Sequence, residues 1–246
     1  MNVALLAAKL TFLFDRYYAW PMEFPGVSCI VPVFNEAERI GGVLAALVNH
    51  PLIAEIIVVD DGSTDSTVAV VQKYPSIRLI LLPQNGGKTK ALETGIKASK
   101  NPVLLLMDGD LLGLKPQHVS DLIMPVLEGR VDLAISLREN APLPWRWIGL
   151  DYISGERVFH RSLLQLPLGQ LPRFGFEVYL NSLCIKRKCR IAVVAWRGVR
   201  SPLKSRKYGF LKGIKADLRM LRDLAQTQPM LGLIAQVRHM RRLRIK

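Results

Sequence analysis

The stretch EIIVVDDGSTD, residues 55–65, decides the fold. A short, continuous apolar run that is bounded by turn residues is typical of a strand buried on both faces of a parallel sheet. The run ends in the carboxylates of Asp60 and Asp61, and the following Gly-Ser-Thr-Asp offers the turn and N-cap chemistry that starts a helix. The stretch therefore predicts a strand-turn-helix unit with acidic side chains at the carboxyl end of the strand.

The same arrangement recurs on both sides of this unit. We expect further strands at 27–33, 77–82, 103–107 and 131–137, and helices at 40–48, up to about 74, at 88–99 and at 116–127. Apolar strands that alternate with helices predict an α/β fold: a Rossmann-like, mostly parallel central sheet flanked by helices. Ligands of such sheets bind beyond the carboxyl ends of the strands. Polar clusters at four of these ends predict a single site, formed by residues 35–36, 60–61, 85–88 and 108–110.

The pattern changes after Asn140. Residues 141–148 (APLPWRWI) are rich in Pro and Trp and predict a mobile loop. We expect two helices after it, near 151–165 and 175–185, then a last strand at 191–196. From residue 208 onward the sequence predicts one or two basic helices that are split near Pro229.

Positive charge is concentrated at the C-terminal end. Of the 34 Lys and Arg residues, 18 follow residue 185, together with only two of the 20 acids, Asp217 and Asp223. A basic tail on a near-neutral body indicates an anionic surface or substrate, although a solvated helical end would have the same composition. Its apolar positions form a stripe that we expect to lie on an anionic membrane or to belong to the core: Leu233, Ile234, Val237 and Met240.

The cysteines and the N-terminal segment bear on the compartment. Cys29, Cys184 and Cys189 have no metal-ligand spacing and cannot all pair, which favours a reducing, cytoplasmic environment. No stretch reaches the length of a membrane span. Residues 3–14 are apolar but interrupted by Lys9, and we interpret residues 1–24 as an N-terminal amphipathic segment.

Asp108-Gly109-Asp110 directly follows the expected strand at 103–107. Two carboxylates that are separated by one glycine can both face a divalent cation. Oxygen ligands suit Mg²⁺ or Mn²⁺, which would bridge a diphosphate. A solvated Asp pair in a strand-ending turn would have the same sequence, so this motif alone does not establish a metal site.

Four motifs occur in order at the strand ends: residues 30–36 (IVPVFNE), 58–65 (VVDDGSTD), 85–88 (NGGK) and 108–110 (DGD). Over about 27–137 this series resembles the family 2 glycosyltransferases of the GT-A fold, and a looser likeness to small bacterial members related to dolichyl-phosphate mannose synthases continues through Gly213. The resemblance implies a metal-dependent enzyme that moves a sugar from a nucleotide-diphosphate sugar to an acceptor hydroxyl with inversion. Related synthases that transfer glucose to phosphoglycerate retain the configuration, so the stereochemical outcome stays open.

The resemblance also implies roles for residues of this sequence. The loop at 32–36 and the turn after the second strand would hold the nucleoside, with Asp61 accepting from the base. Lys88 would approach the base or the diphosphate, while Asp108 and Asp110 would take the ribose and the metal. The full nucleotide-sugar-binding set comprises Pro32, Phe34, Glu36, Asp61, Gly62, Ser63, Lys88, Asp108, Arg200 and Lys204. The metal ligands would be Asp108 and Asp110.

Motifs in the second half of the chain indicate which kind of family 2 glycosyltransferase it resembles. Residues 154–159 (SGERVF) resemble a segment that faces the acceptor in small bacterial members. Glu177 falls where relatives place an acid at a helix start, and it is our candidate catalytic base; a surface acid that favours the helix dipole is the alternative. Relatives often have a His after the Gly-Val pair as a third metal ligand. Here Arg200 and Ser201 follow that pair, so the third ligand stays open.

These expectations divide the chain into three parts. Residues 1–24 form the N-terminal segment, 25–200 the GT-A catalytic domain, and 201–246 the basic C-terminal tail. Within the catalytic domain, 25–137 would bind the nucleotide sugar and 138–200 the acceptor. The acceptor itself, whether a glycan, a small molecule or a lipid-linked group, is not specified by the sequence.

Three alternative functions remain open. A polyprenyl-phosphate glycosyltransferase, peripheral on the inner face of the membrane, is favoured by the basic tail. A sugar-phosphate nucleotidyltransferase would need a Gly-rich, basic loop after the first strand, where this chain has Phe34-Asn35-Glu36. A non-enzymatic basic module that binds nucleic acid is disfavoured, because the acidic series would repel phosphate without a metal.

Overall fold

A computed structural model describes residues 26–165, 168, 171–172, 175–202 and 230–245. Our expectations for the N-terminal segment, for Lys204 and for a break near Pro229 lie outside the described residues.

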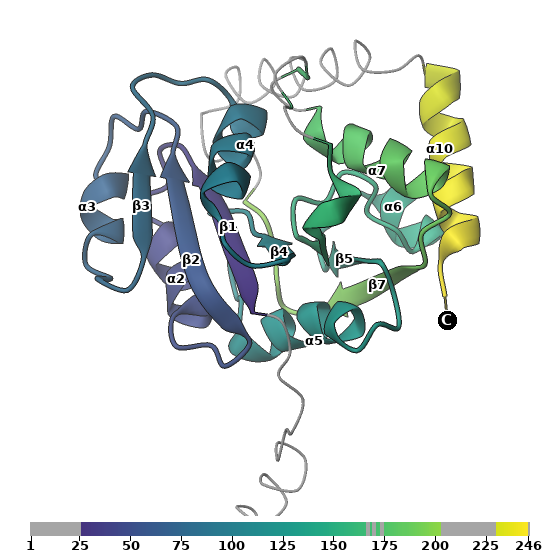
Figure 1. Cartoon of the computed structure of the whole chain (residues 1–246), viewed down its shortest axis with the longest axis horizontal. Coiled ribbons are helices and arrows are strands. Elements are labelled where there is room, and N and C mark those ends of the chain that lie inside the picture. Colours follow the sequence, from purple (N-terminus) through teal and green to yellow (C-terminus); the bar gives the residue numbers. More distant parts are fainter. Residues whose placement is uncertain (1–25, 166–167, 169–170, 173–174, 203–229, 246) are drawn as a thin grey trace, which may run out of the picture.

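In the described part of the chain, one sheet has the strand order β3-β2-β1-β4-β6-β5-β7 (Figure 1). β1 to β4 are parallel, β5 and β7 are parallel to each other, and β6 is antiparallel to both of its neighbours. The mostly parallel α/β sheet is thus confirmed. Its strands are β1 (Val27–Val33), β2 (Ile53–Asp60), β3 (Arg78–Leu81), β4 (Val103–Leu106), β5 (Leu133–Arg138), β6 (Arg157–His160) and β7 (Ile191–Trp196).

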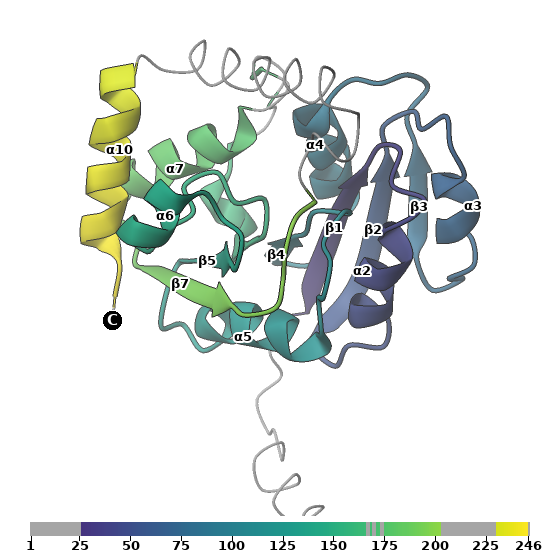
Figure 2. The same cartoon turned by 180° about the vertical axis from the view of Figure 1, so that it is seen from behind.

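Helices cover both faces of the sheet (Figures 1 and 2). One face packs against α2 (Ile40–Leu47), α3 (Thr67–Val71) and α5 (Pro116–Leu127). The other face packs against α4 (Lys88–Ala98) and α7 (Phe176–Lys186). Successive strand residues enter opposite cores, so a central strand has to be apolar on both sides. This double burial explains why the expected strands read as continuous apolar runs.

The segment that follows Gly155 differs from the sequence expectation. We expected a helix near 151–165, but Arg157–His160 form β6 between β4 and β5, and a 3₁₀ turn, η1, follows at Arg161–Leu163. Val158 packs into the core beneath α2 and α5, whereas Phe159 packs into the core beneath α4 and α7. Alternation along a strand places adjacent side chains on opposite faces, which a helix does not do. Pairing on both edges therefore overrides the local pattern.

Residues 143–148 also differ from expectation. The expected loop is a short helix, α6 (Leu143–Ile148). Pro144 lies in its first turn, where a missing backbone N–H costs nothing, and Gly149 ends the helix with a positive φ of 68°. Trp145 and Ile148 pack inward against the core that contains α7.

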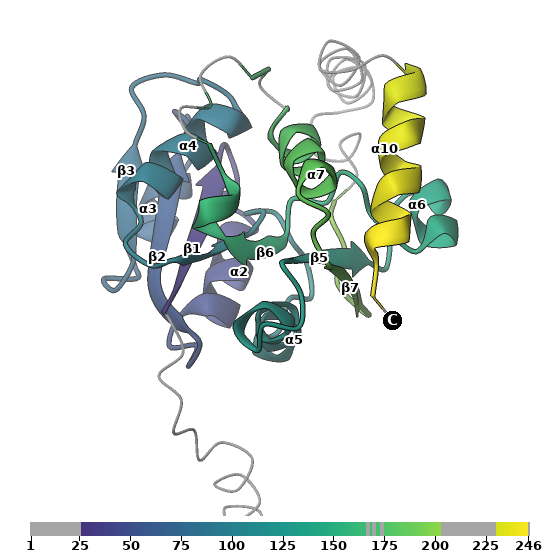
Figure 3. The ribbon, with the colours of Figure 1, turned by 45° about the vertical axis from the view of Figure 1, so that its right-hand side comes forward.

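The last described helix, α10 (Met230–Leu243), packs on α7 (Figure 3). Met240 is completely buried, and Val237 is half-buried in the same core. Gln236 donates a hydrogen bond to the Ser182 hydroxyl at 2.8 Å, and the Ile245 N–H donates to the carbonyl of Ile191 in β7 at 3.0 Å. Val237 and Met240 therefore belong to the core rather than to a membrane-facing stripe.

Because Met240 fills the space between α10 and α7, Met240→Ala should leave a cavity there. We expect it to lower the free energy of unfolding by roughly 2–5 kcal/mol, the usual range for a buried Met. Arg238→Ala, on the exposed side of the same helix, should change it by less than about 0.5 kcal/mol. Urea unfolding followed by circular dichroism measures both, and equal stability of the two variants would contradict the packing of α10.

Candidate active site

The loop that leads into α4 is shaped by Asp61. The two carboxylate oxygens of Asp61 accept hydrogen bonds from the backbone N–H groups of Gly86, at 2.7 Å, and Gly87, at 2.8 Å. Gly62 has a φ of +75°, and a Cβ there would lie 2.9 Å from the backbone nitrogen of Asn85. Only glycine allows this approach. In this structure Asp61 thus fixes the turn before Lys88, which is a role additional to the base contact that the resemblance implies.

The loop after β1 is tied to the turn after β2. The Asn35 N–H donates to the Ser63 hydroxyl at 2.9 Å, and the Thr64 N–H donates to the Asn35 side-chain oxygen at 2.8 Å. The Glu36 N–H donates to the Thr67 hydroxyl at 2.8 Å. These bonds bring the two halves of the expected nucleoside pocket together. In the loop after β1, Glu36 is buried and Phe34 is half-buried; Pro32, also half-buried, lies within β1 itself.

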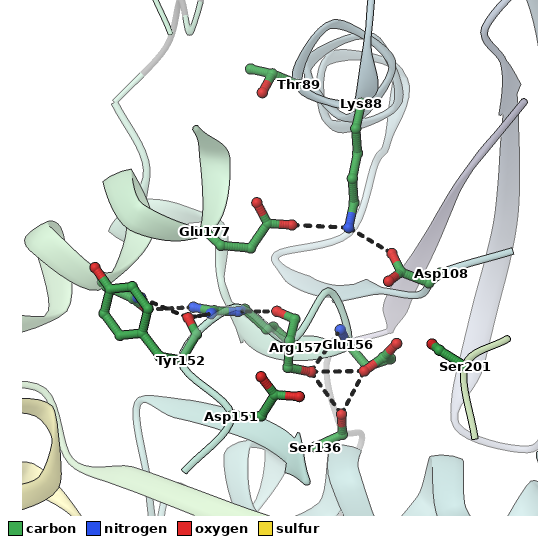
Figure 4. A network of polar contacts seen from close by, with 12 residues as sticks. Lys88, Thr89, Asp108, Ser136, Asp151, Tyr152, Glu156, Arg157, Glu177 and Ser201 are labelled. Atoms are coloured by element: carbon green, nitrogen blue, oxygen red, sulfur yellow. Dashed lines mark hydrogen bonds and ion pairs between the residues drawn. The ribbon is translucent and has the colours of Figure 1, made fainter. Parts of the chain in front are cut away.

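Lys88 lies between two carboxylates from different parts of the chain (Figure 4). Its Nζ is 2.7 Å from Asp108 Oδ1, just after β4, and 2.9 Å from Glu177 Oε1, in the first turn of α7. Burial opposes the charge on Lys88, but Asp108 and Glu177 outweigh it and hold the pKa of Lys88 above its usual value. The Lys88 ammonium therefore brings together three predicted site residues: Lys88 itself, Asp108 and Glu177.

Close packing of this group depends on Gly155. A Cβ at Gly155 would lie 2.3 Å from Asp108 Oδ1 and 2.5 Å from Lys88 Nζ. Any side chain here would have to displace the ion pair. The backbone at 154–156 therefore forms the wall of the site against which Asp108 and Lys88 rest.

Behind Gly155 lies a buried network around Glu156 (Figure 4). Glu156 has no solvent exposure and accepts hydrogen bonds from Ser136, at 2.6 Å, and Ser154, at 2.7 Å. Arg138 is 3.7 Å from Glu156 and 3.0 Å from Asp151. Burial raises the pKa of Glu156 although Arg138 opposes this shift. Ser136 and Arg138 were not predicted as site residues, although both lie at the carboxyl end of β5, beside the other strand ends.

Arg157 connects this network to α7. Its guanidinium is buried and donates to the carbonyls of Ser154 and Tyr152, both at 2.8 Å, and to the Asn181 side-chain oxygen at 2.5 Å. Asn181 lies one helical turn beyond Glu177. Arg157 therefore fixes the segment that contains Gly155 relative to the helix that carries Glu177.

Asp110 faces an excess of negative charge. Burial, the charge of Asp108 and the charge of Glu156 together raise the pKa of Asp110 to about 6. A divalent cation would relieve this repulsion, so the carboxylates fit the metal site that we expected. Among the described residues no three His, Cys, Asp or Glu side chains are grouped to hold a metal. The remaining ligands would have to come from a diphosphate and water.

Arg200 is paired through its backbone with Leu112, two residues after Asp110, but it is not part of the group around Lys88. Its backbone exchanges hydrogen bonds of 2.9 and 3.0 Å with Leu112, and its guanidinium pairs with Glu139. The Arg200 side chain is 60% exposed. This ion pair ties Arg200 to Glu139, which is not one of the two metal-site carboxylates, and Lys204 lies outside the described residues.

The model of the family described as "Glycosyl transferase family 2" matches residues 28–184. Dodecaprenyl-phosphate galacturonate synthase from Rhizobium johnstonii is 33% identical over 49% of this chain and 38% of its own length. Dolichyl-phosphate β-glucosyltransferase from Dictyostelium discoideum is 31% identical over 68% of this chain and 51% of its own length. The chain thus spans about half, or less, of these curated relatives.

A solved structure shares the fold over most of both chains. Glucosyl-3-phosphoglycerate synthase from Mycobacterium tuberculosis, in complex with Mn²⁺, UDP-glucose and glycerol 3-phosphate, superposes with a TM-score of 0.62. It is 26% identical, and the match covers 82% of this chain and 80% of that one. The fold is that of the GT-A glycosyltransferases. Within that class, the chain belongs to glycosyl transferase family 2.

The raised pKa of Asp110 predicts how the stability of the metal-free protein depends on pH. Between about pH 4 and pH 6 the folded chain holds a proton on Asp110 that the unfolded chain has lost. Stability should therefore fall as the pH rises through this window. Asp110→Asn should remove that loss and be more stable than wild type above pH 6, by on the order of 1–2 kcal/mol after allowance for solvent screening.

Chemical unfolding at a series of pH values in the presence of chelator measures this difference. Asp121→Asn, on the surface of α5, is the matched control and should follow the wild-type profile. An Asp110→Asn profile that also follows wild type would contradict the charge repulsion at Asp110.

Proposed function

We propose that this chain transfers a sugar from a nucleotide-diphosphate sugar to an acceptor hydroxyl, with inversion and with a divalent metal ion. The observation that carries the proposal is the convergence of Lys88, Asp108 and Glu177 within 3 Å contacts at the carboxyl ends of the sheet. The acidic pair at 108–110 suits a metal-bound diphosphate of the donor. Glu177, from the second half of the chain, lies beside it and would face the acceptor.

The donor would lie over the ends of β1, β2 and β4. The loops at 32–36 and 61–63 would enclose the nucleoside, because they are cross-linked by hydrogen bonds into one wall. Asp108 and Asp110 would hold Mg²⁺ or Mn²⁺, whose charge stabilises a leaving diphosphate. The mycobacterial relative was crystallised with Mn²⁺ and UDP-glucose, which supports this choice of cofactor.

Lys88 and Glu177 would act on the reacting groups. Lys88 has its ammonium beside Asp108, from where it could turn to the leaving diphosphate and stabilise its charge. Glu177 would then be released from the ion pair and could accept the proton of the attacking hydroxyl. Attack on the face opposite the leaving group inverts the anomeric centre. Arg200 and Lys204 remain candidates for additional contacts with the diphosphate.

A second candidate function changes only the acceptor. The names of two relatives, a dodecaprenyl-phosphate galacturonate synthase and a dolichyl-phosphate β-glucosyltransferase, favour a polyprenyl phosphate. A phosphate is already anionic and needs no base. The two candidates therefore differ in what they require of Glu177.

We also propose a cytoplasmic enzyme that associates with the inner membrane surface. All three cysteines are buried and free, which suits a reducing compartment. No helix in the part of the chain that the structure describes is long and apolar enough to cross a membrane. An anionic surface would attract the basic C-terminal quarter. Nucleic acid is not a proposed partner, because the site is acidic.

Donor turnover tests the transfer reaction. Purified protein is incubated with each common nucleotide sugar and Mn²⁺, and release of nucleoside diphosphate is measured. We expect release with one donor class, abolition by chelator, and a loss of roughly 10²-fold or more in Asp110→Asn, because metal stabilisation is worth several kcal/mol. Asp121→Asn should keep wild-type rates. Wild-type turnover that persists in chelator would contradict the metal assignment.

Glu177→Gln separates the two acceptor classes. Donor affinity should be preserved in this variant, as measured by calorimetry. With a hydroxyl acceptor, kcat should fall by roughly 10²–10⁴, the usual size of a general-base contribution. With a polyprenyl phosphate acceptor, kcat should change little.

Glu128→Gln, at the C-terminal end of α5, serves as the control. If Glu177→Gln binds donor normally and turns over a hydroxyl acceptor at the wild-type rate, Glu177 is not the base. Asp151 and Glu156 would then be the next residues to test.

A further inference from the structure

α6 exposes large apolar side chains on its outer side. Trp147 is 85% exposed and Leu143 is 61% exposed, while Trp145 of the same helix packs inward with its ring centroid 5.9 Å from that of Tyr152. Six large apolar side chains are exposed in the described part of the chain, and four of them lie on α6, on α10 or directly after α10. Two of the four are Leu143 and Trp147, and the others are Ile234, 52% exposed, and Ile245, 40% exposed.

α6 and α10 are neighbours in space although they are far apart in the sequence. The Arg244 guanidinium donates to the carbonyl of Ile148, at the end of α6, at 3.2 Å. Figures 2 and 3 show the two helices side by side at the end of the molecule that is opposite β3. The exposed apolar residues of both helices therefore lie at the same end of the molecule.

The same region is strongly basic. Arg146 of α6 and Arg238, Arg241 and Arg242 of α10 are exposed. Neither 140–150 nor 230–246 contains a single Asp or Glu. The resulting combination of exposed Trp and aliphatic side chains with clustered Arg, and without acids, is typical of segments that lie in the headgroup region of an anionic membrane.

We propose that this region, the α6–α10 surface, docks on an anionic lipid bilayer. It consists of Leu143, Arg146, Trp147, Ile234, Arg238, Arg241, Arg242 and Ile245. Trp147 and Leu143 enter the boundary between headgroups and acyl chains, where Trp side chains are enriched. The arginines contact lipid phosphates. A second copy of this chain would bring the same positive charges together, so the charge of the surface favours lipid over self-association.

This proposal rests on the proposed function and specifies which surface of the chain contacts the membrane. α6 follows Arg138, a member of the buried network beside Asp108, after the short connection 139–142. Docking through α6 would therefore bring the bilayer to the acceptor half of the chain. It also differs from binding through the apolar stripe of α10, because Met240 and Val237 face the core.

Vesicle co-sedimentation of the full chain tests the proposal without any sugar donor, so its outcome is independent of the transfer reaction. Wild type should bind vesicles of phosphatidylcholine with phosphatidylglycerol and not vesicles of phosphatidylcholine alone. The triple variant Arg238→Gln, Arg241→Gln, Arg242→Gln should bind roughly 100-fold more weakly, about 5-fold for each arginine near the surface. Trp147→Ala should weaken binding by about 10-fold or more.

Two matched controls lie outside the α6–α10 surface. Leu81→Ala removes another exposed apolar side chain, and the triple variant Lys73→Gln, Arg78→Gln, Lys100→Gln removes three exposed positive charges. Both should bind as wild type does. Thermal unfolding confirms that each variant is folded.

Quenching by brominated lipid provides a second measurement. Because Trp147 is one of four tryptophans, the difference in quenching between wild type and Trp147→Phe reports on Trp147. A quenched difference signal supports insertion of α6. Wild type that fails to bind anionic vesicles, a Trp147→Ala variant that binds as tightly as wild type, or a wild-type dimer that Trp147→Ala converts to a monomer in sedimentation would each overturn the proposal.

Discussion

The site depends on the Lys88 ammonium, which pairs with the carboxylates of Asp108 and Glu177. Lys88 starts α4, Asp108 follows β4 and Glu177 lies in the first turn of α7, so the ammonium joins the half that we expect to bind the nucleotide to the half that we expect to bind the acceptor. Four buried or half-buried acids lie around the Lys88 ammonium: Asp108, Asp110, Glu156 and Glu177. Without Lys88 and Arg138, the repulsion between these carboxylates would oppose folding. Lys88 and Arg138 leave part of this negative charge uncompensated at Asp110, and a divalent metal ion would offset it there.

Most of the supporting structure keeps this cation in place. Asp61 shapes the turn before Lys88 through two backbone hydrogen bonds, Gly155 leaves room for the ion pair, and Arg157 holds α7 at the correct distance. None of these three groups needs to touch a substrate to be essential. Substitutions at Gly155 would therefore affect catalysis by displacing Asp108 and Lys88.

The first half of the chain could be predicted because its signals are local. Each buried strand is a continuous apolar run, and each ends in a polar cluster, so the sheet and the positions of Asp61, Lys88 and Asp108 follow from order alone. The second half could not be predicted in this way. β6 is defined by pairing with β4 and β5, and α6 is stabilised by packing of Trp145 and Ile148, neither of which a local pattern contains. Arg138 and Ser136 were missed because their partners are contributed by residues 151–156.

The antiparallel strand β6 has a consequence for how the substrate range of such an enzyme could change. Because β6 runs opposite to β4, the residues that precede it arrive at the same edge of the sheet as those that follow β4, and Leu106 pairs with Arg157. The chain between β5 and β6 is thus an excursion that leaves this edge and returns to it. Its exposed part, residues 142–147, is remote from the paired residues of both strands, so we expect its length and composition to vary without a change of register. Under the proposed division of the chain, exchange of the mostly exposed residues 142–147 between relatives would be a modular route to new acceptors, whereas Asp151 and Tyr152 are held in the buried network.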